Sequence, residues 1–268
     1  MQALLGAARH GLIALSVLKT TDGGFTVYPL LPLVDGERVV FALPYAEALT
    51  ARDLARASGG VVLVFADGRL AGRAWSPVAA AGRVTLDEDP RGDRFQRSLL
   101  TQELYKHPPS RALIDSPMLR REHWWYVPRL LVTFEPERIW PVEPLDSERG
   151  VLAWMGEERV DAATTVVEGG AGGWEHDVVV LQARPAGCGG RVLLCRHDFS
   201  LPDREVSSTL VVQGMVDGRR VRAEERRGAA ALPPAPGLLR RMRRQRALER
   251  GCRAGLAAAG SQGRGRVP

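Results

Sequence analysis

The order of strand and turn signals between residues 11 and 89 constrains the fold more than any single residue does. Apolar runs typical of β-strands occupy residues 11–18, 25–34, 38–43, 60–66 and 74–86. Three of the intervening turns contain Asp-Gly, at residues 22–23, 35–36 and 67–68, and this pair supplies the positive φ that tight hairpins need. We expect one helix in this stretch, from Thr50 to about Ser58. The order predicts a small antiparallel barrel crossed by one short helix.

The next segment combines helical and extended signals. The spacing of Phe95, Leu99, Leu100 and Leu104 predicts a helix over residues 95–105, which a proline pair at 108–109 ends. A shorter helical piece is expected over residues 110–118. Residues 124–134 and 138–142 predict one long last strand with a break at Pro136.

The second half of the chain has the pattern of an all-β region. A stretch rich in proline and acidic residues at 143–149 predicts a boundary. Beyond it lie six short strand candidates, at residues 151–155, 163–167, 178–183, 192–195, 209–216 and 219–223, with no convincing helix among them. Glycine-rich loops separate several of these strands.

The positive charge is concentrated at the end of the chain. Residues 237–268 hold nine Arg and one Glu, a net charge of +8, so the +6 of the whole chain leaves about −2 for the rest. Arginine outnumbers lysine by 35 to 2 and asparagine is absent, as in proteins from GC-rich genomes. We therefore do not expect the folded body to bind nucleic acid. The tail predicts a basic helix over residues 238–248, which could contact nucleic acid, an acidic partner or an anionic surface, or remain solvated ahead of a disordered end at 260–268.

Cysteine content and hydropathy suggest the compartment. The three cysteines form no CxxC pair and leave one over, which favours a reducing cytoplasm. Arg9 and His10 interrupt the N-terminal apolar stretch, so we do not expect a signal peptide. No apolar run approaches the roughly 18 residues of a membrane span. The sequence predicts a cytoplasmic protein with no membrane partner.

Two further clusters favour structural roles. Cys188, Cys195, His197 and Asp198 match no compact zinc spacing, so we expect no metal site. The aromatic cluster at residues 123–126 could stack on a planar cofactor, but packing into the core is the favoured interpretation.

The segment Thr50-Ala51-Arg52-Asp53 is the most useful local signal. It has the pattern of a capping box, in which Thr50 caps the helix and Asp53 bonds back to the Thr50 amide. Arg52 would then lie in the first turn, where the helix dipole disfavours a cation unless an anion lies beside it. Free amides at a helix N-terminus and an adjacent Arg are typical of phosphate binding. A solvated Arg52 is the alternative.

The order of these elements resembles the flavin-binding split β-barrels related to pyridoxamine 5′-phosphate oxidase. The resemblance covers about residues 3–142, and it depends on the order and local sequence of the elements. The segments that carry it are Gly11-Leu12-Ile13-Ala14-Leu15, Pro29-Leu30-Leu31-Pro32, Val39-Val40-Phe41-Ala42-Leu43, Thr50-Ala51-Arg52, Gly59-Gly60 with Val61-Val62-Leu63-Val64, Val84-Thr85-Leu86-Asp87, and Phe134-Glu135-Pro136-Glu137-Arg138-Ile139-Trp140.

The resemblance implies an FMN-dependent oxidoreductase that moves a hydride between flavin and a small organic substrate. It implies that Thr50 and Arg52 hold the flavin phosphate. The strand end Ala42, Leu43 and Pro44 would line the ring or the ribityl chain, and Trp75 and Ser76 would approach the ring. In this family the cofactor lies at a subunit interface, so a homodimer is implied. No residue is assigned as a catalytic acid or base.

The fold class expected is mainly β with short helices. The predicted domains are a split barrel over residues 1–145, a smaller β-rich domain over 150–228, and a basic helical or disordered tail over 237–268. Two alternatives remain: the same barrel holding a deazaflavin or haem, and a non-catalytic binding or regulatory module whose tail recruits an anionic partner.

Overall fold

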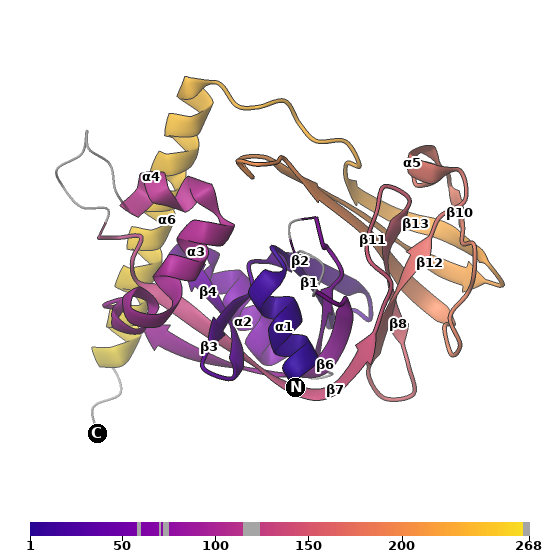
Figure 1. The fold of residues 1–268 in the computed structure, drawn as a ribbon, viewed down its shortest axis with the longest axis horizontal. Helices are drawn as coiled ribbons and strands as arrows, with labels where there is room; N and C mark the ends of the chain where they lie inside the picture. The colour runs from indigo at the N-terminus through magenta and orange to yellow at the C-terminus, as the bar shows by residue number, and fades with distance from the viewer. Residues whose placement is uncertain (58–59, 70, 72–74, 115–123, 265–268) are drawn as a thin grey trace.

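The computed structural model describes residues 1–57, 60–69, 71, 75–114 and 124–264 of the chain, and two antiparallel sheets dominate it (Figure 1). The first sheet has seven strands in the order β2-β1-β5-β6-β7-β4-β3. Its strands are β1 (Ala14–Lys19), β2 (Phe25–Leu30), β3 (Leu33–Asp35), β4 (Arg38–Pro44), β5 (Val61–Phe65), β6 (Val78–Asp89) and β7 (Arg129–Pro141). The edge strands β2 and β3 are linked only by Leu31 and Pro32, so the two edges lie near each other and the sheet curls into a split barrel.

The second sheet has six strands in the order β10-β13-β12-β11-β8-β9. They are β8 (Arg149–Met155), β9 (Val160–Val166), β10 (Val178–Val180), β11 (Gly190–Phe199), β12 (Ser207–Asp217) and β13 (Arg220–Gly228). The β11–β12 hairpin pairs from Gly190 with Val216 to Phe199 with Ser207 and is much longer than predicted. A single helical turn, α5 (Gly170–Gly173), occupies a glycine-rich loop where no helix was predicted. The prediction of a mainly β fold with short helices is confirmed.

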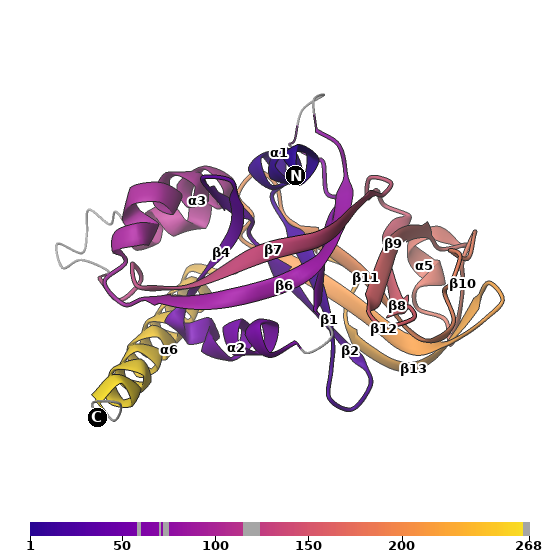
Figure 2. The same ribbon diagram turned by 90° about the horizontal axis from the view of Figure 1, so that it is seen from below.

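Short helices cover the barrel. They are α1 (Gln2–His10), the 3₁₀ turn η1 (Tyr45–Glu47), α2 (Ala48–Arg56), the π-turn η2 (Phe95–Leu99), α3 (Leu100–Lys106), the 3₁₀ turn η3 (Pro108–Ser110) and α4 (Arg111–Ile114). In Figure 2, α1 and α2 lie on opposite sides of the long β6–β7 ribbon. The helix predicted over residues 95–105 is present as η2 and α3. The second predicted piece forms only α4, and residues 115–118 lie outside the described residues.

Three predicted details of the barrel are wrong. The run 25–34 is two strands, because Pro32 interrupts the ladder between β2 and β3. The expected break at Pro136 is only a bulge: β7 continues through it, and Glu137 is the extra residue where the register shifts between Ala81 and Gly82. A Cβ on Gly82 would lie 2.1 Å from the Glu135 carbonyl oxygen, so this close approach needs glycine. Residues 67–68 form no tight hairpin, since β5 ends at Phe65 and β6 begins at Val78.

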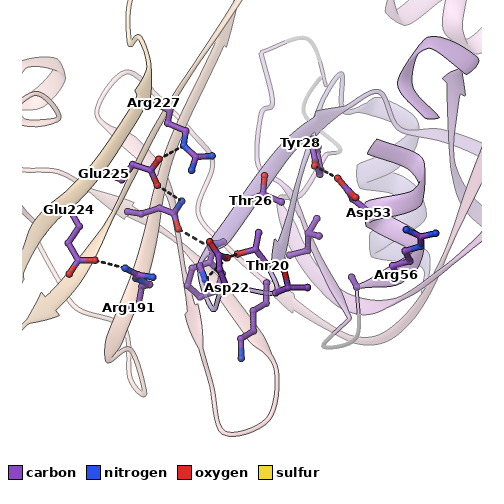
Figure 3. A pocket seen from close by; sticks show the side chains of 17 residues that line it. Thr20, Asp22, Thr26, Tyr28, Asp53, Arg56, Arg191, Glu224, Glu225 and Arg227 are labelled. Carbon is purple, nitrogen blue, oxygen red and sulfur yellow. Dashed lines mark hydrogen bonds and ion pairs between the residues drawn. The ribbon is translucent and has the colours of Figure 1, made fainter. Parts of the chain in front are cut away.

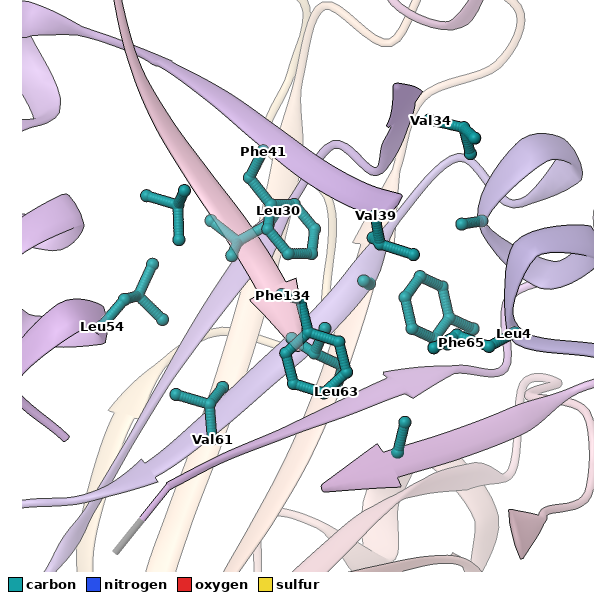
Figure 4. Packing of buried hydrophobic residues seen from close by; sticks show 14 of the residues in the cluster. Leu4, Leu30, Val34, Val39, Phe41, Leu54, Val61, Leu63, Phe65 and Phe134 are labelled. Atoms are coloured by element: carbon teal, nitrogen blue, oxygen red, sulfur yellow. The ribbon is translucent and has the colours of Figure 1, made fainter. Parts of the chain in front are cut away.

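The barrel interior is a single apolar cluster (Figure 4). Alternate residues of β4 and β5 point into it, among them Val39, Phe41, Leu63 and Phe65. Leu4 of α1 and Leu54 of α2 reach the same cluster from the two covering helices. The helices are therefore fixed by burial of one apolar stripe each.

The other face of the barrel packs against the second sheet. One cluster joins Leu15, Val17 and Val62 of the barrel to Val151 and Leu193 of the second sheet, and all five side chains are buried. The two sheets therefore share a continuous hydrophobic core. The barrel residues Leu15, Val17 and Val62 thus contact a part of the chain that the sequence alone does not indicate as their partner.

The last helix, α6 (Leu238–Arg264), packs through its C-terminal half on the barrel. A Cβ on Gly255 would lie 2.5 Å from the Tyr45 carbonyl oxygen, so this close approach to η1 needs glycine. Cys252 is fully buried, and Leu256 packs on the barrel core. The helix continues to Arg264, beyond the predicted start of disorder at residue 260. Among the described residues, no helix is both long and apolar enough to cross a lipid bilayer.

Candidate functional site

A cleft of about 930 Å³ lies between the barrel and the second sheet (Figure 3). Its walls come from the β1–β2 hairpin, the C-terminal end of α2 and strands β11 to β13. This volume lies within the range of small-molecule sites in proteins. The lining is largely polar and includes Lys19, Thr20, Thr21, Asp22, Thr26, Tyr28, Asp53, Arg56, Arg191, Gln213, Glu224, Glu225 and Arg227.

Tyr28 and Asp53 connect the barrel wall to α2. The Tyr28 hydroxyl donates a hydrogen bond of 2.8 Å to Asp53 Oδ2. Partial burial raises the pKa of Tyr28, and the hydrogen bond and charge of Asp53 raise it further. The phenol therefore stays protonated and presents an aromatic ring to the cleft at neutral pH.

Gln213 connects the second sheet to the hairpin. Its Oε1 accepts a hydrogen bond of 2.9 Å from the buried Phe25 backbone amide, and its Nε2 lies 3.4 Å from Glu225 Oε2. At the hairpin tip, Asp22 accepts hydrogen bonds from the Thr20 hydroxyl and the Gly24 amide, which lower the pKa of Asp22. The cleft wall is thus held by contacts between segments far apart in the sequence.

The cations of the cleft fall into two groups. Arg191 pairs with Glu224 at 2.7 Å, and Arg227 pairs with Glu225. Lys19 and Arg56 make no ion pair with any residue in the described part of the chain. The cleft therefore offers two cationic groups that are available to an anionic ligand.

The helix start differs from the prediction around Thr50. Helix α2 begins at Ala48, and Glu47 precedes it without a side-chain cap. The reason is that η1 leads directly into α2, where the Ala48 amide bonds to the Tyr45 carbonyl. Thr50 is thus inside the helix, and Asp53 bonds to Tyr28 instead of the Thr50 amide. The capping box is wrong.

Arg52 remains a candidate ligand-binding residue. Its side chain is half-buried, and it makes no hydrogen bond or ion pair with another residue of the described ranges. Arg52 and Arg56 are four residues apart on α2, so they share one face of the helix. Thr50 and Arg52 do not line the 930 Å³ cleft, whereas the next turn of α2 does.

The other predicted site residues lie at two ends of the barrel. Ala42, Leu43 and Pro44 end β4 beside residues 129–131 of β7, and Leu43 is buried in the barrel core. They lead through η1 into α2, so the structure brings them near Thr50 and Arg52. Trp75 and Ser76 precede Val78 at the start of β6, whereas β4 ends beside the part of β7 that pairs with the Asp89 end of β6. The structure does not bring these two groups together.

The remaining sequence candidates have structural surroundings. Trp125 and Tyr126 are buried, which confirms the core interpretation for these two aromatics. Trp124 is 54% exposed, so the interpretation is wrong for this residue. His123 lies outside the described residues. Cys188 and Cys195 are free thiols in different hydrophobic clusters.

A second polar cluster is buried beneath α3. Glu103 Oε1 accepts hydrogen bonds from Ser110 Oγ at 2.8 Å, Tyr126 Oη at 2.7 Å and Arg129 Nη2 at 3.3 Å. The Arg129 guanidinium lies over the Phe95 ring at 4.1 Å and the Tyr126 ring at 4.0 Å. Burial, and then the Glu103 charge, raise the pKa of Tyr126. Glu103 and Arg129 are inaccessible to a ligand, so we assign this cluster to stability.

Sequence reasoning missed most of the cleft. Tyr28 and Arg56 belong to predicted elements and Lys19 directly follows the first predicted strand, but nothing in their spacing distinguishes them from other exposed residues. Gln213 is 188 residues from Phe25, so its contact exists only because the two sheets pack together. The only sequence signal for the barrel side of the cleft is the order of its strands and helix.

Comparison with solved structures finds several chains that match at low identity. A pyridoxamine 5′-phosphate oxidase-related, FMN-binding protein from Nostoc punctiforme is 11% identical, with a TM-score of 0.33 over 61% of this chain and 93% of that one. A heme-binding protein from Mycobacterium smegmatis is 15% identical, with a TM-score of 0.31 over 93% of this chain and 96% of that one. General Stress Protein 26 from Bacillus anthracis is 9% identical, with a TM-score of 0.31 over 54% of this chain and 94% of that one.

No protein-family profile matches the chain, and no curated protein matches it. At these identities and TM-scores the likenesses do not bear on the ligand. The functional argument therefore rests on the cleft itself.

Proposed function

We propose that this protein binds FMN beside α2 and uses it in redox transfer with a small organic substrate. The observation that supports this proposal most is the 930 Å³ cleft, which presents Lys19 and Arg56 without carboxylate partners among the described residues and places Tyr28 on the same wall. A flavin mononucleotide needs a cationic site for its phosphate and a flat contact for its ring, and these residue types suit both needs.

The roles of the residues follow from their positions. Arg56 and Arg52, one turn apart on α2, would hold the phosphate, with Lys19 facing it from β1 and Thr50 one turn before the cleft. Tyr28 would contact the ring, and its hydrogen bond to Asp53 fixes the phenol. Ala42, Leu43 and Pro44 lead into the start of α2 and do not line the cleft, so they are left out of this assignment. Trp75 and Ser76, at the other end of β6, are left out of this assignment.

Guanidinium groups carry the phosphate in this proposal, in place of free amides at a helix N-terminus. The reason is that α2 continues directly from η1, against which α6 packs, so α2 does not begin as a separate helix N-terminus. FMN, when bound, supplies the hydride chemistry, so the protein residues need only bind and orient the cofactor and substrate. This division of roles agrees with the lack of an assigned catalytic acid or base.

The first test is the absorption spectrum of the purified full chain after incubation with FMN and removal of free ligand. Retained flavin bands support the proposal. The same measurement with haem and with a deazaflavin distinguishes the alternatives, because haem gives a Soret band and a deazaflavin a single violet band. If the protein retained haem or the deazaflavin but not FMN, that ligand would replace FMN as the assigned cofactor. If it retained none of the three, the proposed function would be refuted.

The second test uses variants in a flavin-fluorescence titration. A charge-assisted contact to phosphate contributes about 1.5–3 kcal/mol, so Arg56→Ala and Arg52→Ala should each weaken FMN binding about tenfold to hundredfold. Arg184→Ala, an exposed arginine that does not line the cleft, is the matched control. Equal affinity in all three variants would exclude the phosphate role of α2.

A further inference from the structure

The first two turns of α6 expose large apolar side chains. Leu238, Leu239 and Met242 are 72%, 71% and 43% exposed. They follow the linker of residues 229–237, and in Figure 1 this end of α6 extends away from the two sheets. The apolar side chains are therefore clustered on a projecting part of the molecule.

The same part of α6 is strongly basic. Arg240, Arg243, Arg244, Arg246 and Arg250 make no ion pair with any residue that the structure describes, whereas Arg241 pairs with Glu205. Leu239, Arg243, Arg246 and Arg250 follow one another at spacings of four, three and four residues, so they form one stripe along the helix. Cys252, about half a helical turn away from this stripe, is on the packed face.

We propose that residues 238–250 of α6 form a docking surface for an anionic phospholipid bilayer. In this arrangement the helix lies on the bilayer surface, with Leu238, Leu239 and Met242 in the headgroup region and the arginine stripe on the lipid phosphates. Leu239 lies within the arginine stripe, and Leu238 and Met242 lie beside it, so one side of the helix offers both apolar and cationic groups to the bilayer surface. The packed C-terminal half of α6 would keep the protein body beside the bilayer.

The apolar side chains favour lipid over nucleic acid. Binding to a phosphate backbone requires only the cations, and exposed leucines add nothing to it. A bilayer surface uses both features, because apolar burial and attraction to anionic headgroups act together. Association of this kind needs no membrane-spanning helix.

The test is co-sedimentation of the full chain with vesicles of phosphatidylglycerol and phosphatidylcholine, compared with vesicles of phosphatidylcholine alone. We expect binding to the anionic vesicles only, decreasing as salt rises. The variant Arg243→Gln/Arg246→Gln/Arg250→Gln should lower the partition coefficient about a hundredfold. Leu238→Ser/Leu239→Ser/Met242→Ser should lower it at least about tenfold, and these exposed positions leave the packed half of α6 intact.

The matched control removes the same charge elsewhere, with Arg184→Gln/Arg220→Gln/Arg222→Gln on the exposed surface of the second sheet. This control should bind as the wild type does, apart from a weak effect of net charge. Absence of wild-type binding, equal loss in the control, or equal binding to neutral vesicles would overturn the proposal. The proposal would also be overturned if the leucine variant changed retention on DNA, or changed the oligomeric state, and left vesicle binding unchanged.

Discussion

The cleft beside α2 and the buried cluster around Glu103 use the same residue types in opposite ways. In the buried cluster, Glu103 accepts three hydrogen bonds and its cation, Arg129, lies between two aromatic rings. In the cleft, the Arg191–Glu224 pair is about half exposed, and Lys19 and Arg56 have no described partner. Burial and full pairing make charged residues part of the framework, whereas openness and lack of pairing leave them available to a ligand.

The largest expected effect comes from breaking the buried pair. Arg129→Met should lower the free energy of unfolding by about 3–5 kcal/mol, because it leaves Glu103 buried without its cation. Arg191→Met, which breaks the exposed pair with Glu224, should cost less than about 1 kcal/mol. Urea denaturation of both variants measures the difference, and equal costs would contradict the contrast between the two regions.

Lys106 extends the contrast, because it is buried without a carboxylate. Its Nζ donates to the Ala8 carbonyl and, at 2.7 Å, to the Pro32 carbonyl. Burial, and then the nearby Arg204, lower the pKa of Lys106 to about 7 from 10.5. Between these two pH values the unfolded chain binds one more proton than the folded one, so this group makes the fold more stable as pH rises.

The corresponding prediction is a difference in pH dependence. From pH 7 to 10 the unfolding free energy of the wild type should rise relative to Lys106→Met by up to about 1.4 kcal/mol per pH unit. Urea denaturation across this range measures the slope. Lys19→Met, which removes the exposed lysine of the cleft, is the matched variant for loss of one positive charge. Parallel curves for wild type and Lys106→Met would show that Lys106 has an ordinary pKa in the fold.

The contact between the two sheets gives a smaller expected effect. Gln213→Ala leaves the buried Phe25 amide without an acceptor, which should cost about 1–3 kcal/mol. Gln182→Ala, at a surface position of the second sheet, should change stability by less than about 0.5 kcal/mol. Thermal unfolding followed by circular dichroism provides the measurement, and equal melting temperatures would show that water replaces the Gln213 contact at no cost.

Local patterns predicted the barrel strands well because alternation and turn chemistry act over a few residues. Gly23 and Gly36 have the positive φ that their Asp-Gly turns predicted. The third such pair failed, since the chain at residues 67–68 enters a longer connection in which the Trp75 ring packs against Gly68. Local patterns alone could not distinguish a hairpin from this long-range packing.

The site was less predictable, because its walls come from both sheets. The sequence indicated α2 as a binding element, and the cleft does use its second half. The start of α2 was predicted two residues late, since η1 and α6 set it through contacts that no local pattern contains. Gln213 and Glu225 could not have been assigned to the cleft, because only the shared core between the sheets places them there.

The smallest expected effect on stability tests the open region itself. Tyr28→Phe removes the hydrogen bond to Asp53, and because this contact is exposed the loss should be less than about 1 kcal/mol. FMN affinity should stay nearly unchanged in Tyr28→Phe, since the ring is retained, and fall in Tyr28→Ala, which removes it. A flavin titration of the two variants separates the hydroxyl from the ring. Equal affinities would exclude Tyr28 as the ring contact, while leaving the phosphate role of Arg52 and Arg56 to be judged by their own variants.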